Sequence, residues 1–180
     1  LADSYTEAFD LIIRAQQKGL NVSDDLFDTI NEYGTQFRKL GLDGAEAFGL
    51  IAQAVKGGAR DTDTAADALK EFSIRAIDGS KTTGDAFHSL NLSWKDTAQA
   101  FAAGGDTAKV MFQEVVDRIA AIDDPVKRAQ VQVALFGTKA EDLGDAVNAM
   151  NLSTAVDEFG QVQGAAQDAA DTMGGTAASA

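Results

Sequence analysis

The 180-residue sequence predicts an all-α protein, a bundle or array of about nine or ten short helices, and three observations lead to this fold class. Apolar residues recur at intervals of three and four, and no stretch alternates apolar and polar residues as a strand would. Aspartates outnumber glutamates 21 to 7. Because Asp is unfavourable inside a helix but is a good N-cap, this excess indicates many helix starts. Gly follows most of the apolar stripes, where it would end a helix.

The first two helices are predicted from their end signals. Ser4 and Glu7 form a capping box at the start of a helix that ends before Gly19. Ser23 is expected to cap a second helix, which we expect to end at Gly34. Their apolar faces are Phe9, Ile12 and Ile13 in the first helix, and Leu26, Phe27, Ile30 and Tyr33 in the second.

The next two helices have similar signals. Asp43 and Glu46 form a second capping box, and Gly57-Gly58 ends the helix that follows. A fourth helix is predicted over residues 61–77, before a turn at residues 78–80. Their apolar stripes are Phe48, Ile51 and Val55, and then Ala65, Ala68, Leu69, Phe72 and Ala76.

The second half of the domain shows four further starts. A short helix is expected over residues 83–90, and Ser93 caps another that ends at Gly104-Gly105. Asp106 opens a strongly amphipathic helix, and Asp124-Pro125 opens the next, with Pro at the first helical position. Apolar residues of these last two helices are Met111, Phe112, Val115, Val116, Ile119 and Ile122, and then Val126, Ala129, Val133 and Phe136 before a stop at Gly137.

The C-terminal part of the chain changes in composition. One more helix with Leu143 and Val147 is expected over residues 138–150. Residues 1–150 are predicted to form a compact α-helical domain, and residues 151–180 an Ala- and Gly-rich helical linker or tail. We expect one helix from about Ser153 that needs a partner for its thin apolar stripe. That stripe consists of Val156, Phe159, Val162, Ala166, Ala169 and Met173.

A short pattern recurs at four places, in which two apolar residues enclose a small or polar one and a capping residue follows. Its copies are residues 20–23, 40–43, 90–93 and 150–153. Phe37 and Phe87 precede two of these copies by three residues. One interpretation is a set of tandem helical repeats, and the other is the ordinary entry of a packed loop into a helix. The irregular spacing favours the second interpretation.

The composition argues against several classes of function. The absence of Cys excludes a disulfide framework and a thiolate metal site. A net charge of -13 would repel a phosphate backbone, so no direct nucleic-acid binding is predicted. No run approaches the roughly 20 apolar residues of a membrane span. Because the chain begins with Leu1 and not Met, we expect it to be part of a longer protein.

No metal site is predicted from the candidate ligands. His88 is the single histidine, and a metal site needs further strong ligands. Asp61 and Asp63 begin a run that resembles a calcium loop, but Ala66 replaces the required Gly and Phe72 replaces the bidentate Glu. Helix capping explains these aspartates better.

No catalytic or cofactor-binding site is predicted either. The two Gly-Gly pairs are not phosphate loops, because neither is followed by Lys and Ser or Thr. The glutamates fall on polar helix faces, so none is expected to have the raised pKa of a glycosidase acid, although the sequence leaves a carboxylate pair open. Trp94 is either a core anchor or a partner-binding residue, and the core is favoured. We therefore predict that the chain is not an enzyme.

Two segments near the end of the compact domain resemble a known family. They read IDDPVKR at residues 122–128 and VALFGTKAEDL at residues 133–143. Together they resemble the tape measure (minor tail) proteins of long-tailed bacteriophages. Residues 33–43 and 98–105 resemble the helical region of the same family, and the likeness covers roughly residues 20–175.

The resemblance implies a structural protein that sets tail length, around which the tail tube assembles, and that acts in DNA ejection. It implies tube proteins, tail-tip proteins, assembly chaperones and another copy of itself as partners. It places the protein in the virion tail, after assembly in the host cytoplasm. A stand-alone bacterial helical scaffold or adaptor remains an alternative, as does a fragment of a cell-wall hydrolase, because some family members carry peptidoglycan-cleaving domains.

The end signals also predict how extended the chain is. As one continuous helix, 180 residues would span about 270 Å. As a compact domain they would have a radius of gyration of about 16 Å. The Gly pairs, Pro125 and the repeated caps predict the compact form for the isolated chain.

Overall fold

The structure is a computed structural model that describes residues 2, 4–20, 26–143 and 145–177, with their side chains except at 26–31, 142 and 174–177. These residues form twelve α-helices and no strand, which confirms the all-α prediction. The helices are α1 (Tyr5–Gln17), α2 (Leu26–Lys39), α3 (Gly44–Lys56), α4 (Thr62–Arg75), α5 (Lys81–Ser89), α6 (Trp94–Ala103), α7 (Gly105–Ala120), α8 (Pro125–Phe136), α9 (Lys139–Leu143), α10 (Ala146–Ala149), α11 (Leu152–Phe159) and α12 (Ala165–Ala177).

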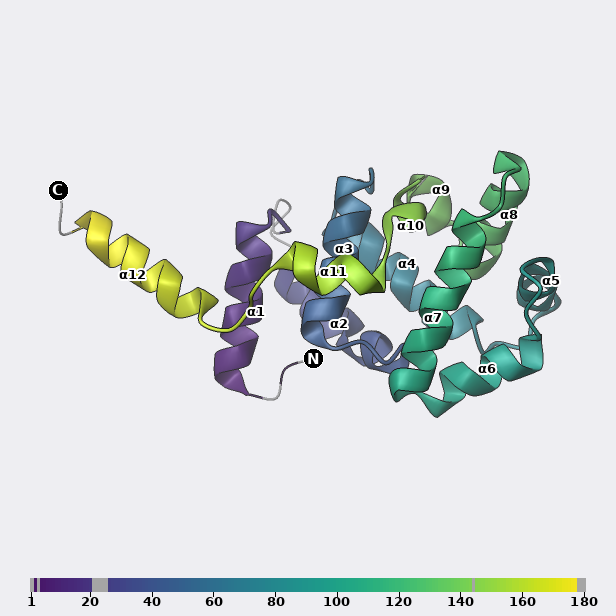
Figure 1. Cartoon of the computed structure of the whole chain (residues 1–180), viewed down its shortest axis with the longest axis horizontal. Coiled ribbons are helices and arrows are strands. Elements are labelled where there is room, and N and C mark those ends of the chain that lie inside the picture. Colours follow the sequence, from purple (N-terminus) through teal and green to yellow (C-terminus); the bar gives the residue numbers. More distant parts are fainter. Residues whose placement is uncertain (1, 3, 21–25, 144, 178–180) are drawn as a thin grey trace.

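The helices form an elongated array (Figure 1). Helices α3 and α4 lie in its middle, α5 and α8 lie at one end, and α12 extends from the other end beyond α1. The closest helix pairs are α3 with α11, α2 with α4, α6 with α7, α1 with α12, and α4 with α8. Each pair except α6 with α7 joins helices that are distant in sequence, so the array is held by tertiary packing.

A cluster of aromatic rings joins four helices of the array. The ring of Phe72, on α4, lies 5.2 Å from the rings of both Phe101 and Phe112 and 4.9 Å from that of Phe136, between centroids. These three partners come from α6, α7 and α8, and all four side chains are buried. Aromatic pairs at this separation add to the stabilisation that burial provides. The stripe predicted for residues 61–77 therefore supplies the contact that unites four helices.

The predicted N-caps are confirmed at five helices. Each capping side chain accepts a hydrogen bond from a backbone N–H group of the first turn, which satisfies a donor that the helix itself leaves unpaired. The caps are Ser4 of α1, Asp43 of α3, Asp61 of α4, Ser93 of α6 and Asp124 of α8. At α3 the capping box is complete, because the Glu46 side chain also accepts from the Asp43 N–H at 2.9 Å.

The expected end of the second helix at Gly34 is wrong. Helix α2 continues to Lys39, and the chain leaves it at Gly41, which has a φ of +74°. Tyr33 and Phe37 are buried with Leu40 along one face, so the apolar stripe continues past Gly34 and its burial outweighs the low helix propensity of one Gly. The cap expected at Ser23 lies outside the described residues.

Two expected single helices are each divided. The segment 138–150 forms α9 and α10, in which Leu143 and Val147 are buried as predicted. The segment from Ser153 forms α11 and α12, separated by Gly160 and Gly164, which have φ values of +87° and +84°. Helix α11 packs against α3, while α12 contacts α1. The division of the chain into domains at residue 150 stays a prediction.

Two copies of the recurring pattern adopt the same turn. Leu42 N–H donates to Phe37 O at 3.0 Å, and Leu92 N–H donates to Phe87 O at 2.9 Å. Gly41 and Asn91 both have positive φ, so each pattern is a Schellman C-cap followed directly by the N-cap of the next helix. The copy at 150–153 differs, because Asn151 itself caps α11. A local capping motif therefore accounts for the likeness of the copies at 40–43 and 90–93.

Candidate functional site

Two of the polar candidates from the sequence, Asp61 and Asp63, have structural roles. Asp61 caps α4 by accepting from the Thr64 N–H at 2.7 Å. Asp63 accepts a hydrogen bond of 2.9 Å from the Tyr33 hydroxyl, and burial together with this bond raises the pKa of Tyr33. His88 is exposed on α5. Over the described parts of the chain, no group of three His, Cys, Asp or Glu side chains is placed to hold a metal ion.

The prediction that Trp94 is a core residue is wrong. Its side chain is 38% exposed at the first position of α6, directly after the Ser93 cap. The indole lies over Gly79 in the turn before α5, where an added Cβ would be 3.7 Å from it. The first turn of a helix at the edge of the array has few neighbours, which explains the exposure.

The apolar stripe predicted for α8 does not face the core as a whole. Only Phe136 of that stripe is buried, while Val126 is 64% exposed and Ala129 is also exposed. The side of α8 that packs inward instead carries Val131, Gln132, Leu135 and Phe136. Helix α8 is therefore apolar on two opposite faces, which is typical of a helix covered on both sides.

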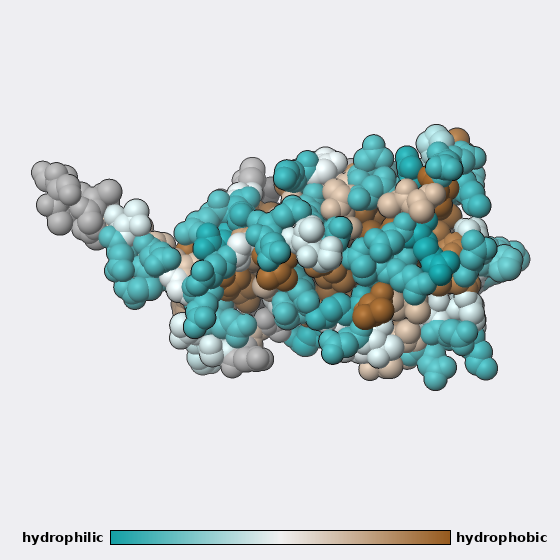
Figure 2. Space-filling view, in the orientation of Figure 1, coloured by the Kyte–Doolittle hydropathy of each residue, from teal (hydrophilic) through white to brown (hydrophobic). Residues whose placement is uncertain are grey.

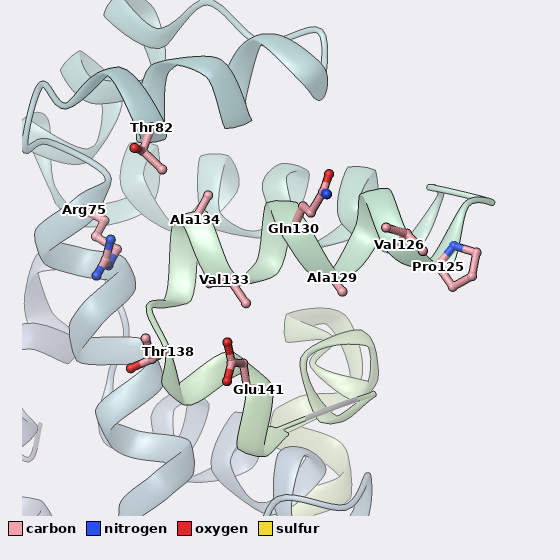
Figure 3. Close-up of a pocket in the computed structure, with 10 residues that line it drawn as sticks. All are labelled: Arg75, Thr82, Pro125, Val126, Ala129, Gln130, Val133, Ala134, Thr138 and Glu141. Atoms are coloured by element: carbon pink, nitrogen blue, oxygen red, sulfur yellow. The ribbon is translucent and has the colours of Figure 1, made fainter.

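The outward face of α8 forms one wall of an open groove with a volume of about 800 Å³ (Figure 3). Its apolar wall is contributed by Pro125, Val126, Ala129, Val133 and Ala134. Its polar groups are Arg75 of α4, Thr82 of α5, Gln130 of α8, Thr138 before α9, and Glu141 of α9. Figure 3 shows Glu141 facing Val133 and Ala129, and Arg75 on the helix beside the C-terminal end of α8.

The walls of this groove are fixed by specific contacts. Gln132 is buried on the inward side of α8 and donates to the Asn148 side chain of α10 at 3.0 Å. At the other end, Gly137 has a φ of +72°, and an added Cβ would lie 3.1 Å from the Glu71 carboxylate and 3.4 Å from Arg75 Nε. Gly137 thus lets α8 end directly against the Arg75–Glu71 ion pair, whose N–O distance is 3.2 Å.

The charge at the groove differs from that of the protein. The two charged residues that line it, Arg75 and Glu141, have opposite charges, in a chain with a net charge of -13. Glu141 is the only carboxylate among the described residues that line the groove. The face of the molecule seen in Figure 2 is mostly hydrophilic, with hydrophobic patches that include the end where α7 and α8 lie.

These features suit the binding of a partner. The groove has no His, and its hydroxyl groups, on Thr82 and Thr138, have no imidazole base beside them. A long apolar wall beside a few polar groups is the usual receptor for an amphipathic helix. The sequence did not predict this groove because periodicity places Val126, Ala129 and Val133 on one apolar face without indicating whether that face is buried. The available signal was that α8 has apolar residues on a second face, Val131 and Leu135, opposite Val126 and Ala129.

Comparisons with known proteins agree with the resemblance in the sequence. The sequence model of a family described as "Phage-related minor tail protein" matches residues 2–137. A probable tape measure protein of Streptomyces phage phiC31 is 44% identical over 178 residues, which is 99% of this chain and 24% of that protein. The chain therefore spans about a quarter of the length of this curated relative.

Two further findings concern the structure. No solved structure shows a significant match to this chain. In the residues that the structure describes, no helix is long and apolar enough to span a membrane.

Proposed function

Because the chain belongs to the family of phage-related minor tail proteins, we propose that it is a folded helical section of a tape measure protein, in the tail of a long-tailed phage. The observation that carries this proposal is the identity of 44% over 99% of the chain to a probable tape measure protein. That alignment runs through all twelve helices, so it concerns the whole fold and not one motif.

We infer that the complete protein acts as a scaffold and ruler for the tail tube and leaves with the DNA at infection. Its proposed partners are tube proteins, tail-tip proteins and assembly chaperones, first in the host cytoplasm and then in the virion. The net charge of -13 supports this role, because an acidic protein does not adhere to DNA that passes it.

We also propose that this section is compact when isolated. The buried contacts of Phe72 with three other helices, and the packing of α11 on α3, support a compact form. Small-angle scattering of the isolated chain tests this, with an expected radius of gyration near 16 Å, somewhat enlarged by the projecting α12. A rod-like profile with a length near 270 Å would contradict the proposal.

The role in tail length is tested by deleting the codons for residues 1–180 from the parent gene, in frame. If the section contributes as one extended helix, the tails shorten by about 270 Å in electron micrographs. If it stays compact in the tail, they shorten by much less. The matched control replaces the section with the aligned section of the Streptomyces phage relative, which should preserve tail length. Normal-length, infectious tails after the deletion would argue against any role of this section in tail length.

The prediction that this section is not an enzyme needs its own test. We expect the purified chain to cause no clearing of a cell-wall suspension in a turbidity assay, with lysozyme as the positive control. Clearing that is lost on replacing one carboxylate, with the fold intact, would instead support the hydrolase alternative.

A further inference from the structure

Side chains of α1 bind the backbone between α11 and α12, which passes beside α1 (Figure 1). The Asp10 carboxylate accepts two hydrogen bonds of 2.9 Å at the start of α12, one from the Gly164 N–H and one from the Ala166 N–H. Asp10 is buried. It lies on the same side of α1 as Arg14 and Lys18, because the three residues are spaced four apart.

The two basic residues on this side of α1 bind carbonyl groups of the same connection. Arg14 Nε donates to the Gln161 carbonyl oxygen, and Lys18 Nζ donates to that of Glu158, at 2.7 Å each. We call Asp10, Arg14 and Lys18 the α1 clasp. The clasp therefore binds four backbone groups, two N–H groups and two carbonyl groups, between the last turn of α11 and the first turn of α12.

These four backbone groups are ones that would bond to each other's neighbours if α11 and α12 were one continuous helix. In an α-helix each carbonyl accepts a hydrogen bond from the N–H four residues later. The Glu158 carbonyl would then accept from the Val162 N–H, and the Gly164 N–H would donate to the Gly160 carbonyl. Because a backbone N–H has one hydrogen to donate, the bonds to Asp10 and a continuous helix exclude each other.

The sequence of the connection is otherwise compatible with a helix. Its apolar residues keep helical spacing across the break, since Phe159, Val162 and Ala166 are three and four positions apart. The connection contains no Pro. Gly160 and Gly164 are the residues that oppose a helix, because Gly has low helix propensity. The division into two helices therefore depends on these two glycines and on the clasp.

Helix α1 is held by the body on one side only. Its buried residues are Asp10, Leu11 and Ala15, whereas the Tyr5 side chain is 90% exposed and that of Phe9 is 61% exposed. Release of α1 therefore exposes a modest area of apolar surface. Helix α11 does not depend on α1 for its place, because it packs against α3.

We propose that the α1 clasp keeps α11 and α12 apart, and that residues 152–177 form one continuous helix when α1 is released. The helix extends from α11, which is already formed, so no new helix nucleus is needed. These 26 residues would span about 39 Å as one helix. The clasp is thus a conformational switch between a bent and a straight end of the chain. The proposal does not depend on the function in the tail.

The first test favours the continuous helix without changing α1. Gly160 and Gly164 have φ values of +87° and +84°, which Ala rarely adopts, although an added Cβ has room at both positions. Gly160→Ala combined with Gly164→Ala therefore disfavours the divided form, and each substitution also favours a helix by about fivefold. Nuclear magnetic resonance of the 180-residue chain measures the result, from the Cα chemical shifts and the rates of amide hydrogen exchange.

We expect two linked changes in this double variant. In the divided form, no N–H group of residues 161–163 donates a hydrogen bond to another residue that the structure describes. Residues 160–164 should acquire helical Cα shifts, and exchange at residues 161–163 should slow by at least about tenfold, because these amides gain helical bonds. Exchange in α1 should become faster, because the clasp loses its partners.

A second variant removes the clasp and leaves the glycines in place. Asp10→Ala combined with Arg14→Ala deletes three of the four bonds and should produce the same two changes. It also tests the proposal if the glycine variant does not fold, and circular dichroism establishes that each variant is folded.

Gly104→Ala is the matched control for backbone strain. Gly104 also separates two helices, and its φ and ψ of +69° and -167° are close to the +87° and 178° of Gly160. Helices α6 and α7 pack against each other, so they cannot form one straight helix. This substitution should leave exchange in α1 and at residues 161–163 unchanged.

Three outcomes would overturn the proposal. The first is a connection that stays non-helical in the folded glycine variant. The second is a helical connection with unchanged exchange in α1, which would mean that the clasp and the continuous helix coexist. The third is a clasp variant in which exchange in α12 becomes faster while residues 160–164 stay non-helical, which would mean that the clasp only anchors α12.

Discussion

Gln53 and Asn151 exchange two hydrogen bonds across 98 residues of sequence. The Asn151 N–H donates to Gln53 Oε1 at 2.7 Å, and Gln53 Nε2 donates to the Asn151 carbonyl at 3.2 Å. The same Nε2 also donates to Thr154 Oγ1 at 2.9 Å, and Gln53 is buried. One side-chain amide on α3 therefore satisfies the backbone groups at the start of α11 and determines where that helix begins.

Replacing Gln53 with Leu should lower the free energy of unfolding by about 1–3 kcal/mol, because it leaves the partly buried Asn151 N–H without its acceptor. Urea denaturation followed by circular dichroism measures the change. Gln99→Leu is the matched control, because Gln99 is exposed on α6 and its replacement should change stability by less than about 0.5 kcal/mol. Similar effects of the two substitutions would show that the exchange with Asn151 adds little to stability.

Gly49 allows α3 and α11 to approach each other. A Cβ at Gly49 would lie 2.4 Å from the Ala155 carbonyl oxygen, which is backbone and cannot move by a rotamer change. Gly49→Ala should therefore separate the two helices and lower the free energy of unfolding by at least about 2 kcal/mol. At Gly84, inside α5, an added Cβ meets nothing within 4 Å, so Gly84→Ala should raise stability by about 0.5–1 kcal/mol. Thermal unfolding measures the change in stability of both variants, which should have opposite signs. A Gly49→Ala variant that is more stable than the wild type would contradict the close approach of α3 and α11.

Features that depend on neighbouring residues in the sequence were predicted, whereas features that depend on contacts between distant residues were not. Caps at Asp43 and Asp124 depend on residues two or three positions away, so a local pattern identifies them. The continuation of α2 through Gly34 depends on burial of Phe37, which no local signal reports. The bonds of Gln53 and Asp10 join residues about 100 and 150 positions apart.

The groove was missed for a related reason. Periodicity detects that Val126, Ala129 and Val133 share a face, but it does not reveal which of two apolar faces of α8 packs against the array. Only the positions of α4, α5 and α9 decide this. The family resemblance located the same stretch of chain by its residues, yet it carried no information on exposure.

The cap at Asp61 should give the protein a defined acid sensitivity. Partial burial raises the pKa of Asp61, but hydrogen bonds from Thr64 and Arg60 lower it more, so the net shift is downward. A carboxyl group whose pKa is lower in the folded state stabilises the fold above its unfolded pKa of about 3.9, and this contribution is lost as the pH falls through the folded pKa. Asp61→Asn keeps a capping oxygen without titrating. Its free energy of unfolding should therefore fall less than that of the wild type below about pH 4. Equal acid sensitivity of the two proteins would argue against a role for this carboxylate.

The two matching turns at Gly41 and Asn91 should respond differently to reciprocal substitution. Both residues have positive φ, a conformation that Gly adopts freely and Asn tolerates. At Gly41, however, an added Cβ would lie 2.0 Å from the Gly105 carbonyl oxygen, because the start of α7 packs directly on this turn. Asn91 is exposed. Gly41→Asn should therefore lower the free energy of unfolding by about 2 kcal/mol or more, whereas Asn91→Gly should change it by less than about 1 kcal/mol. Urea midpoints at constant m-value measure both changes. Equal decreases in the free energy of unfolding for the two variants would mean that the backbone conformation alone, and not the approach of α7, requires Gly at position 41.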